Sequence, residues 1–326
     1  MTQLMFSADN HHYMDVALRL ARRGIGRVAP NPSVGCVIVK GGRIIGVGRT
    51  HEGGRPHAEA AALSDAGVEA KGADVYVTLE PCALPGRDDP CAGALVEAGV
   101  ARVFVGCGDP NPRVDGLGIQ IMREGGIEVL VGLLEEECIA SHSGFLKKIE
   151  QKRPHVTLKI ATSADHKIAA REGERTQISG ALASRYLHLV RSQHDAIMVG
   201  AKTFKIDTPQ LTARLPGFAH EMKRYVMGEV EAPGFEVIAH GDIAKALEDM
   251  AEQGVTRLLV EGGAKLHQSF LESGFVDEFL WCRSPEEIGA QGVDASYVST
   301  LGQYQLEKSG ERSLGEDRLE IYARDT

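Results

Sequence analysis

Four residues between positions 57 and 91 have the types and order of a zinc site that performs hydrolysis: His57, Glu59, Cys82 and Cys91. One imidazole and two thiolates leave the fourth tetrahedral position of Zn²⁺ open for water. A carboxylate that is not a ligand must then carry protons from that water to a leaving amine, and Glu59 lies two residues after His57. The pattern therefore predicts zinc-dependent deamination of a nucleobase-like amine, with Glu59 as the proton carrier.

The same residues also have an ordinary structural interpretation. A His-x-Glu pair occurs often by chance, and buried cysteines are usually small hydrophobic residues of the core. The combination is much less expected by chance, because each cysteine follows a proline and the four residues lie between strand and helix signals. We therefore favour the zinc site, since a purely structural protein would require the three ligands to be a coincidence.

Local sequence places these residues at the ends of helices and strands. Residues 56–65 are rich in alanine and predict a helix whose first turn carries the histidine and the glutamate. Residues 73–79 alternate and contain β-branched side chains, which predicts a buried strand that a proline ends just before the first cysteine. Another apolar run, 92–98, begins directly after the second cysteine. Two helix starts and one strand end can bring three ligands to one point.

The surrounding segments alternate between strand and helix patterns, which is typical of an α/β domain. The predicted elements are a helix at 9–23, a hairpin of strands 34–40 and 43–48, strands at 101–106 and 127–130, and a helix at 133–149. Before the hairpin, Asn31 lies between two prolines and could aim its amide at a ligand. Turn formation is the usual role of asparagine, so that interpretation stays open as well.

Length and composition restrict the class of protein. At 326 residues the chain is long for one core and indicates two domains, 1–150 and 151–326. The apolar fraction of 43% and the charged fraction of 25% are ordinary for a soluble protein. A formal net charge of −9 argues against a nucleic acid partner. The sequence has no signal-peptide pattern and no apolar run of membrane-spanning length, so we expect a cytoplasmic protein with reduced thiols and no membrane partner.

The second half begins a new series of strands after residues 152–154. Strands are predicted at 156–161, 195–200 and 256–260, and helices at 181–191 and 264–272. The last of these strands runs into Glu261-Gly262-Gly263-Ala264, where free N–H groups and the helix dipole would suit a phosphate. A tight strand-to-helix turn without a ligand is an equally good interpretation of this motif.

The chain resembles the bifunctional deaminase–reductase family of riboflavin biosynthesis over most of its length. In the first half the resemblance rests on Asn31-Pro32-x-Val34-Gly35, His51, His57-Ala58-Glu59, Thr78-Leu79-Glu80-Pro81-Cys82, Gly86-Arg87-x-x-Pro90-Cys91, Asp109-Pro110-Asn111-Pro112 and Gly144-Phe145-Leu146. The long loop between the two cysteines, with its Gly-Arg, is typical of this family and not of most zinc deaminases. The resemblance implies a cytidine-deaminase-like three-layer α/β domain, with Asn31 and His51 as substrate-binding residues.

In the second half the resemblance is to a reductase domain with a dihydrofolate-reductase-like α/β fold. It rests on Val156-Thr157-Leu158-Lys159, Ser163-x-Asp165, Leu189-Val190-Arg191-Ser192, Asp207-x-Pro209-x-Leu211-Thr212-x-Arg214 and Leu259-Val260-Glu261-Gly262-Gly263. The implied NADPH contacts are Ala161, Thr203, Asp207, Gly262, Gly263 and Ala264. The implied substrate contacts are Arg191, Leu211, Arg214 and Glu261. Two arginines suit a substrate that carries a ribose phosphate, because the guanidinium fork matches phosphate geometry.

The resemblance implies two consecutive reactions on a phosphoribosyl-pyrimidine. Zinc-dependent deamination of the diaminopyrimidinone ribosylamino 5′-phosphate would give an aminouracil. NADPH would then reduce the ribosyl group of that aminouracil to ribityl. A homo-oligomer, either a dimer or a tetramer formed through the reductase half, is also implied.

Several positions depart from the family pattern and keep other hypotheses open. Four are single residues: Leu84 in place of a frequent histidine, His166 in place of glycine, Gln177 in place of tryptophan and Thr208 in place of aspartate. In addition, the segment 215–254 looks short, and residues 224–227 look like the remnant of a longer strand. A second hypothesis is therefore an active deaminase with a non-catalytic C-terminal domain for assembly or substrate retention. A third, a nucleic-acid adenosine or cytidine deaminase, is opposed by the long Cys–Cys loop, the second domain and the acidic charge.

Overall fold

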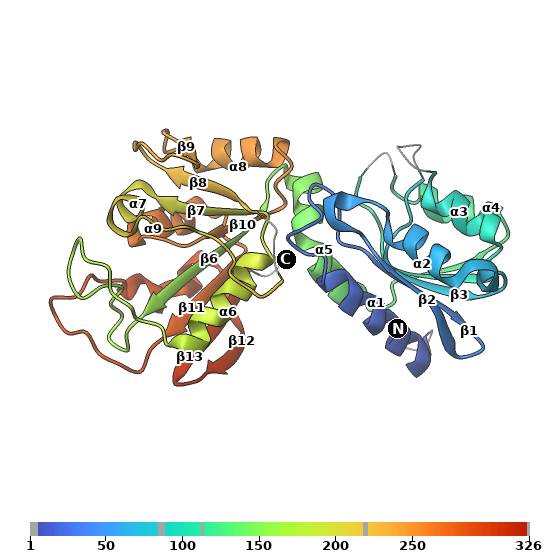
Figure 1. Cartoon of the computed structure of the whole chain (residues 1–326), viewed down its shortest axis with the longest axis horizontal. Helices are drawn as coiled ribbons and strands as arrows, with labels where there is room; N and C mark the ends of the chain where they lie inside the picture. The colour runs from blue at the N-terminus through green and yellow to red at the C-terminus, as the bar shows by residue number, and fades with distance from the viewer. Residues whose placement is uncertain (1–5, 84–88, 112–113, 218–220, 325–326) are drawn as a thin grey trace. The chain divides into compact units, whose positions relative to one another are not determined.

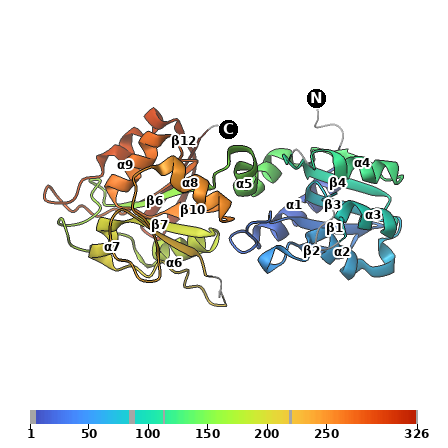
Figure 2. The same cartoon turned by 90° about the horizontal axis from the view of Figure 1, so that it is seen from above.

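The structure is a computed structural model that describes residues 6–83, 89–111, 114–217 and 221–324. The chain divides into two compact units, Met1–Lys152 and Arg153–Thr326 (Figures 1 and 2). None of the helices in the described ranges is long and apolar enough to cross a membrane. Some residues named for the family resemblance lie outside the described ranges: Leu84, Gly86, Arg87 and Pro112.

The first unit is built on a five-stranded sheet with the order β2-β1-β3-β4-β5. The strands are β1 Gly35–Lys40, β2 Arg43–Arg49, β3 Asp74–Leu79, β4 Arg102–Cys107 and β5 Glu128–Val131. Strand β1 runs antiparallel to its hairpin partner β2 and to β3, whereas β3, β4 and β5 are parallel. Nearly every residue of β3 and β4 is buried, as expected for parallel strands that are covered on both faces.

Helices cover both faces of this sheet, which gives three layers (Figure 1). They are α1 Ala8–Arg22, α2 Ala58–Ala66, α3 Cys91–Ala98, α4 Leu117–Glu124 and α5 Glu135–Gln151. Helices α1 and α5 contact each other and pack on one face, while α2, α3 and α4 form a contiguous series on the other. The predicted helices and strands are all present. Helix α4 was not predicted, and His57 is the N-cap of α2 and not part of its first turn.

The second unit contains an eight-stranded sheet with the order β12-β13-β11-β6-β10-β7-β8-β9. Its strands are β6 His155–Thr162, β7 Ala196–Gly200, β8 Lys223–Met227, β9 Glu236–Ile238, β10 Arg257–Val260, β11 Glu278–Arg283, β12 Leu306–Leu314 and β13 Asp317–Arg324. The six strands from β11 to β9 are parallel, and β13 joins them as part of an antiparallel hairpin with β12.

The segment 215–254, which looks short in the sequence, supplies an interior strand of the sheet. Strand β8 pairs with β7 along all five of its residues and lies between β7 and β9. A strand is therefore present at 224–227, and the interpretation of the segment as a shortened form of the family's stays a prediction. The edge strand β9 beside it has three residues.

Helices also cover both faces of the second sheet. They are α6 Ala181–Ser192, α7 Ala201–Asp207, α8 Ile243–Glu252 and α9 Ala264–Ser273, followed by the 3-10 segment Ser296–Tyr304. Alternate side chains of β10 enter two different apolar clusters: Leu258 packs with α8 and α9, and Leu259 packs with α6 and α7. The carboxyl ends of β6, β7 and β10 therefore meet at one edge between the two helical layers.

Candidate active sites

The three side chains predicted as metal ligands converge in the first unit. The ligand atoms of His57, Cys82 and Cys91 all lie within 4.8 Å of one another. The His57 Nδ1 atom is 3.5 Å from the Cys82 sulfur and 3.4 Å from the Cys91 sulfur. Tetrahedral zinc with bonds of about 2.0 Å to nitrogen and about 2.3 Å to sulfur separates such atoms by roughly 3.5 Å. The donor set and its spacing therefore fit Zn²⁺.

Each ligand is positioned by the end of a regular element. His57 is the extended N-cap of α2, Cys91 is the first residue of α3, and Cys82 follows the end of β3. The backbone N–H of Cys91 donates to the Cys82 sulfur over 3.4 Å. A hydrogen bond from the Cys91 thiol, partly opposed by burial, lowers the pKa of Cys82 to about 4. The Cys82 sulfur is thus prepared as a thiolate, which is the form that binds metal.

Glu59 lies beside these ligands, in the first turn of α2. The side chain is buried, with only 4% of its surface exposed. Burial raises the pKa of the Glu59 carboxyl to about 7, against the lowering effects of nearby backbone, of His57 and of a hydrogen bond with Cys91. A carboxyl group with such a pKa can accept a proton and release it again near neutral pH.

Asn31 lies in the loop before β1, and His51 lies in the segment that leads to His57. Asn31 is half-buried and packs against Gly54, where an added Cβ would lie 1.8 Å from the Asn31 amide nitrogen. His51 is exposed, and its backbone N–H donates to the Pro56 carbonyl over 3.1 Å, just before His57. Both residues therefore stand in segments adjacent to the metal ligands, and their substrate contacts stay predictions.

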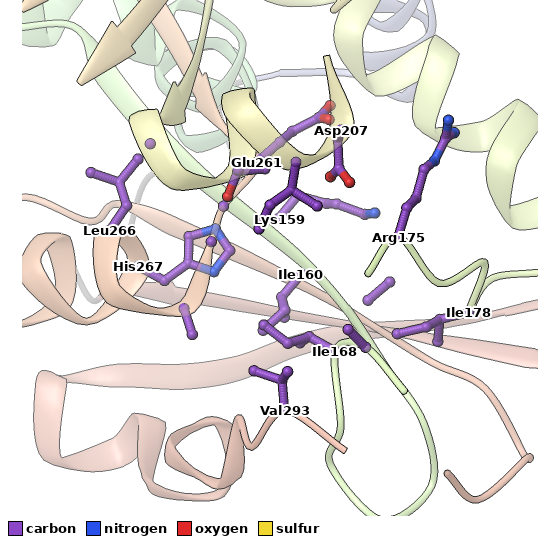
Figure 3. A pocket seen from close by; sticks show the side chains of 18 of the residues that line it. Lys159, Ile160, Ile168, Arg175, Ile178, Asp207, Glu261, Leu266, His267 and Val293 are labelled. Carbon is purple, nitrogen blue, oxygen red and sulfur yellow. The ribbon is translucent and has the colours of Figure 1, made fainter. Parts of the chain in front are cut away.

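A second candidate site is a cavity of about 1260 Å³ in the second unit (Figure 3). Its volume exceeds the roughly 300–1,000 Å³ of a typical single-ligand pocket. In Figure 3, Lys159, Asp207 and Glu261 lie on one side of the cavity, while Ile160 and Ile168 lie on an apolar side. The size and the two kinds of wall suit a large cofactor together with a polar substrate.

The cavity brings together all but one of the residues predicted for the reductase site. Its lining includes Ala161, Arg191, Thr203, Asp207, Arg214, Glu261, Gly262, Gly263 and Ala264. Leu211 is the exception. Its side chain is 2% exposed and packs in the apolar cluster that contains Phe204. The predicted substrate contact of Leu211 would therefore have to come from its backbone, and it stays a prediction.

The Gly-Gly turn after β10 meets the start of α7 at this cavity. The Gly200 N–H donates to the Gly262 carbonyl over 2.8 Å, and an added Cβ on Gly263 would lie 2.9 Å from the Thr203 hydroxyl. Gly262 has a φ of +118°, which glycine tolerates best. Gly263 is the N-cap of α9 and supplies no capping side chain, so the first N–H groups of α9 remain for a ligand.

Arg191 and Glu261 form an ion pair on the cavity wall. Arg191 donates two hydrogen bonds to the Glu261 carboxylate, at 2.7 and 2.6 Å, and a third to the Thr212 carbonyl at 3.1 Å. Burial opposes ionisation of Glu261, but the bonds from Arg191 and the charge of Lys159 outweigh it and lower the pKa of the carboxyl. Arg191 is thus bound to a carboxylate, whereas Arg214 is exposed where it lines the cavity.

Lys159 and Arg175 also line the cavity and were not predicted as site residues. Burial lowers the pKa of the Lys159 ammonium. The signal for Lys159 was present in the sequence, because it is the one charged residue in the predicted strand 156–161. Arg175 gave no such signal, since it belongs to an exposed polar segment that reaches the cavity only in the folded unit.

Three residues that depart from the family pattern lie in the described part of the second unit. His166 has a φ of +60°, a conformation in which glycine is favoured, and its ring packs 5.4 Å from that of Trp281. Gln177 lines the cavity and donates from its side chain to the Ser179 carbonyl over 2.6 Å. Thr208 is the C-cap of α7 with a φ of 39°. Only Gln177 of these three lines the cavity.

Comparison with known proteins supports both halves of the site description. Residues 7–107 match the family model described as the cytidine and deoxycytidylate deaminase zinc-binding region. Residues 154–317 match the model described as the RibD C-terminal domain. The fold and the sites thus define a zinc deaminase domain joined to a RibD-type reductase domain.

Relatives match over almost the full length of the chain. It is 35% identical to the riboflavin biosynthesis protein RibD of Aquifex aeolicus, covering 98% of this chain and 100% of the relative. It is 43% identical to RibD of Haemophilus influenzae, covering 88% of each. Among solved structures, Acinetobacter baumannii RibD matches with a TM-score of 0.89 at 32% identity, covering 98% of this chain and 99% of that one.

A deaminase–reductase from Thermotoga maritima matches with a TM-score of 0.87 at 31% identity, covering 97% of this chain and 99% of that one. The chain belongs to the RibD family of riboflavin biosynthesis proteins. The predicted family and the predicted pair of α/β folds are confirmed.

Proposed function

We propose that this protein carries out two consecutive steps of riboflavin biosynthesis on a small phosphoribosyl-pyrimidine. The first unit deaminates the diaminopyrimidinone ribosylamino 5′-phosphate, and the second reduces the ribosyl group of the resulting aminouracil. The observation that carries the proposal is the convergence of His57, Cys82 and Cys91 beside the buried carboxyl group of Glu59. The T. maritima relative is named as a deaminase and reductase of the same kind, which supports both steps.

In the first unit, His57, Cys82 and Cys91 would hold the zinc ion. Zinc bound by three protein ligands polarises water and makes it a nucleophile near neutral pH. Glu59 accepts the proton of that water and delivers a proton to the departing amine, so ammonia leaves as a neutral molecule. Burial of Glu59 keeps competing solvent away and holds its pKa in the range that this exchange requires.

In the second unit, the turn Gly262–Ala264 would bind the diphosphate of NADPH, and Ala161, Thr203 and Asp207 would line the remainder of the cofactor site. NADPH supplies the hydride. Arg214 would bind the phosphate of the substrate, because Arg191 is paired with Glu261. Glu261, fixed by that pair, would face the reacting group. Hydride transfer depends mainly on this positioning, so few titratable residues are needed.

The cavity favours an active reductase over a purely assembling C-terminal domain. A domain used only for assembly has no need of an open cavity of about 1260 Å³ with charged residues along one wall. Strand β8 pairs with β7 along all five of its residues, which weakens the motive for that alternative. NADPH oxidation by the purified protein, supplied with the deaminated product, tests this directly, and its absence would support the assembling role.

We also propose a cytoplasmic location, a homo-oligomer and no nucleic acid partner. The net charge of −9 supports the last of these, because binding to nucleic acid draws on clustered cations. Size measurement in solution tests the oligomer, and titration with RNA at low salt tests the absence of nucleic acid binding.

A coupled assay tests the proposed function as a whole. The purified zinc-loaded protein is given the diaminopyrimidinone substrate, ammonia release is measured first, and NADPH is then added. We expect ammonia release followed by stoichiometric NADPH oxidation. Ammonia release without oxidation would leave a deaminase alone, and neither signal would contradict the proposal.

A further inference from the structure

His267 in α9 is a buried histidine at the cavity of the second unit, and both of its ring nitrogens have hydrogen-bond partners. Only 2% of its surface is exposed, and the residue belongs to the cavity lining (Figure 3). The Nε2 atom lies 3.3 Å from the carbonyl oxygen of Val260, and the Nδ1 atom lies 3.2 Å from the hydroxyl oxygen of Tyr297. The ring therefore connects the end of β10 with the 3-10 segment Ser296–Tyr304.

These two partners determine the tautomer of the ring. A carbonyl oxygen can only accept, so Nε2 carries the proton and donates to Val260. Burial lowers the pKa of His267 to about 4, so the ring is neutral at pH 7 and Nδ1 is an acceptor. Burial also raises the pKa of Tyr297, which keeps its hydroxyl group protonated as the donor to Nδ1. Donation therefore runs from Tyr297 to His267 and from His267 to Val260.

The bond from His267 to Val260 closes the turn that carries the proposed reductase contacts. Val260 is the last residue of β10, and His267 is the fourth residue of α9, so the bond spans residues 261–263. The ring also lies against the turn itself, because an added Cβ on Gly262 would lie 3.7 Å from the Cε1 atom of His267. A side chain of α9 thus joins the helix to the strand that precedes it.

Strand β7 holds the same turn through its backbone. The Glu261 N–H donates to the Met198 carbonyl over 3.0 Å, and the Gly200 N–H donates to the Gly262 carbonyl over 2.8 Å. These bonds join the turn to β7, whereas the bond from His267 joins α9 to β10. Together they hold the Glu261 carboxyl group and the first N–H groups of α9 in a fixed relation.

We infer that His267, oriented by Tyr297, is a positioning residue of the reductase site, which fixes the Glu261 carboxyl group relative to the N–H groups at the start of α9. The inference rests on the proposed reductase function, in which Glu261 faces the reacting group and the start of α9 binds the diphosphate of NADPH. His267 acts through these groups, and the inference assigns it no contact of its own with the substrate. A change at His267 should therefore alter both the binding of NADPH and the rate of reduction in protein that remains folded.

The test compares His267→Leu, His267→Gln, Tyr297→Phe and the double variant of His267→Leu with Tyr297→Phe in the full-length zinc-loaded protein. Leucine is apolar and has no donor, whereas glutamine keeps an N–H donor for the Val260 carbonyl. His194→Leu is the matched control, since His194 is also buried in the second unit and bonds to a backbone carbonyl, but lies outside the described lining of the cavity. For each protein we measure the folded fraction, kcat and KM for NADPH with the deaminated product, and ammonia release as the internal control.

We expect His267→Leu to raise KM for NADPH about tenfold and to lower kcat about tenfold. His267→Gln should stay within about threefold of the wild type in both constants, because it keeps the bond that spans the turn. Tyr297→Phe should change both constants in the same direction but less, and the double variant should lose no more than His267→Leu, since the two residues act through one connection. His194→Leu should keep the wild-type kcat and KM.

Three results would overturn the inference. A role in packing alone would lower the folded fraction of His267→Leu and leave kcat and KM of its folded enzyme within about twofold of the wild type. Equal losses in His267→Gln and His267→Leu would show that the N–H donor is irrelevant. Losses that multiply in the double variant would show that Tyr297 and His267 act independently.

The inference can be tested even where one variant fails to fold. If His267→Leu yields no folded protein, Tyr297→Phe decides, because an unchanged kcat and KM in that variant contradict the connection through the ring. A wild-type protein that releases ammonia but does not oxidise NADPH would instead contradict the proposed reductase function.

Discussion

Arg191 and Glu261 form a bidentate ion pair, with N–O distances of 2.7 and 2.6 Å, on the wall of the cavity in the second unit. Their side chains are only 12% and 9% exposed. Each charge therefore depends on the other for compensation, because water reaches neither freely. The pair fixes Glu261 at the position where the reduction is proposed to take place.

Breaking this pair should destabilise the second unit and stop the reduction. We expect Arg191→Ala to lower the free energy of unfolding by about 3 kcal/mol, because Glu261 is left buried without its partner. Arg191→Lys keeps the charge but loses the second hydrogen bond, so its effect should be smaller. Denaturant unfolding and NADPH oxidation measure both effects, with ammonia release as the internal control. Full reductase activity in Arg191→Ala would show that Glu261 does not need the pair.

Arg214 should contribute to binding and not to stability. It is exposed at the cavity, and we expect Arg214→Ala to raise KM for the phosphorylated aminouracil about tenfold or more, with the midpoint of unfolding unchanged. Arg185→Ala, an exposed arginine on α6 outside the cavity lining, is the control. Equal KM values for the two variants would assign the phosphate to another residue.

Removal of a metal ligand should separate the two activities. We expect Cys82→Ser and Cys91→Ser to bind little zinc and to release no ammonia, while both continue to oxidise NADPH with the deaminated product. Cys107→Ala removes a buried thiol in the same unit that is not a predicted ligand. Metal analysis after dialysis measures the difference, and zinc retained in both serine variants would mean that the ion binds elsewhere.

Acid should lower the folding stability of the second unit, because it protonates Asp277. Arg153 donates to this carboxylate at 2.7 and 2.9 Å, and the Val156 N–H donates at 2.8 Å. Burial opposes ionisation, but these bonds outweigh it and lower the pKa of Asp277 to about 2. A carboxyl group with a lowered pKa stabilises the fold above its unfolded pKa of about 3.9, and that contribution is lost as the pH falls toward 2.

The loss between pH 4 and 2 should amount to about 2 kcal/mol of unfolding free energy from this residue. Asp277→Asn should already be less stable at pH 7, and its stability should change less over that acid range. Unfolding curves of the two proteins at several pH values provide the comparison. Parallel pH profiles would contradict the assignment to Asp277.

The zinc ligands could be predicted from sequence because metal chemistry restricts residue types and their order over a short segment. The partner of Arg191 could not, since Glu261 lies 70 residues away and nothing local links them. The burial of Leu211 could not be predicted either, because its side chain packs with residues such as Val226 and Leu280 that are distant in the sequence. Helix α4 was missed because its capping carboxylate, Glu80, belongs to another element.

Ammonia release by Glu59→Gln is the most direct measurement for the deaminase site. Glutamine preserves the size of the side chain but cannot carry a proton between water and the leaving amine. We expect the variant to bind zinc like the wild type, to oxidise NADPH normally with the deaminated product, and to release ammonia about 10²- to 10⁴-fold more slowly. A zinc-loaded Glu59→Gln protein that releases ammonia at nearly the wild-type rate would contradict the account.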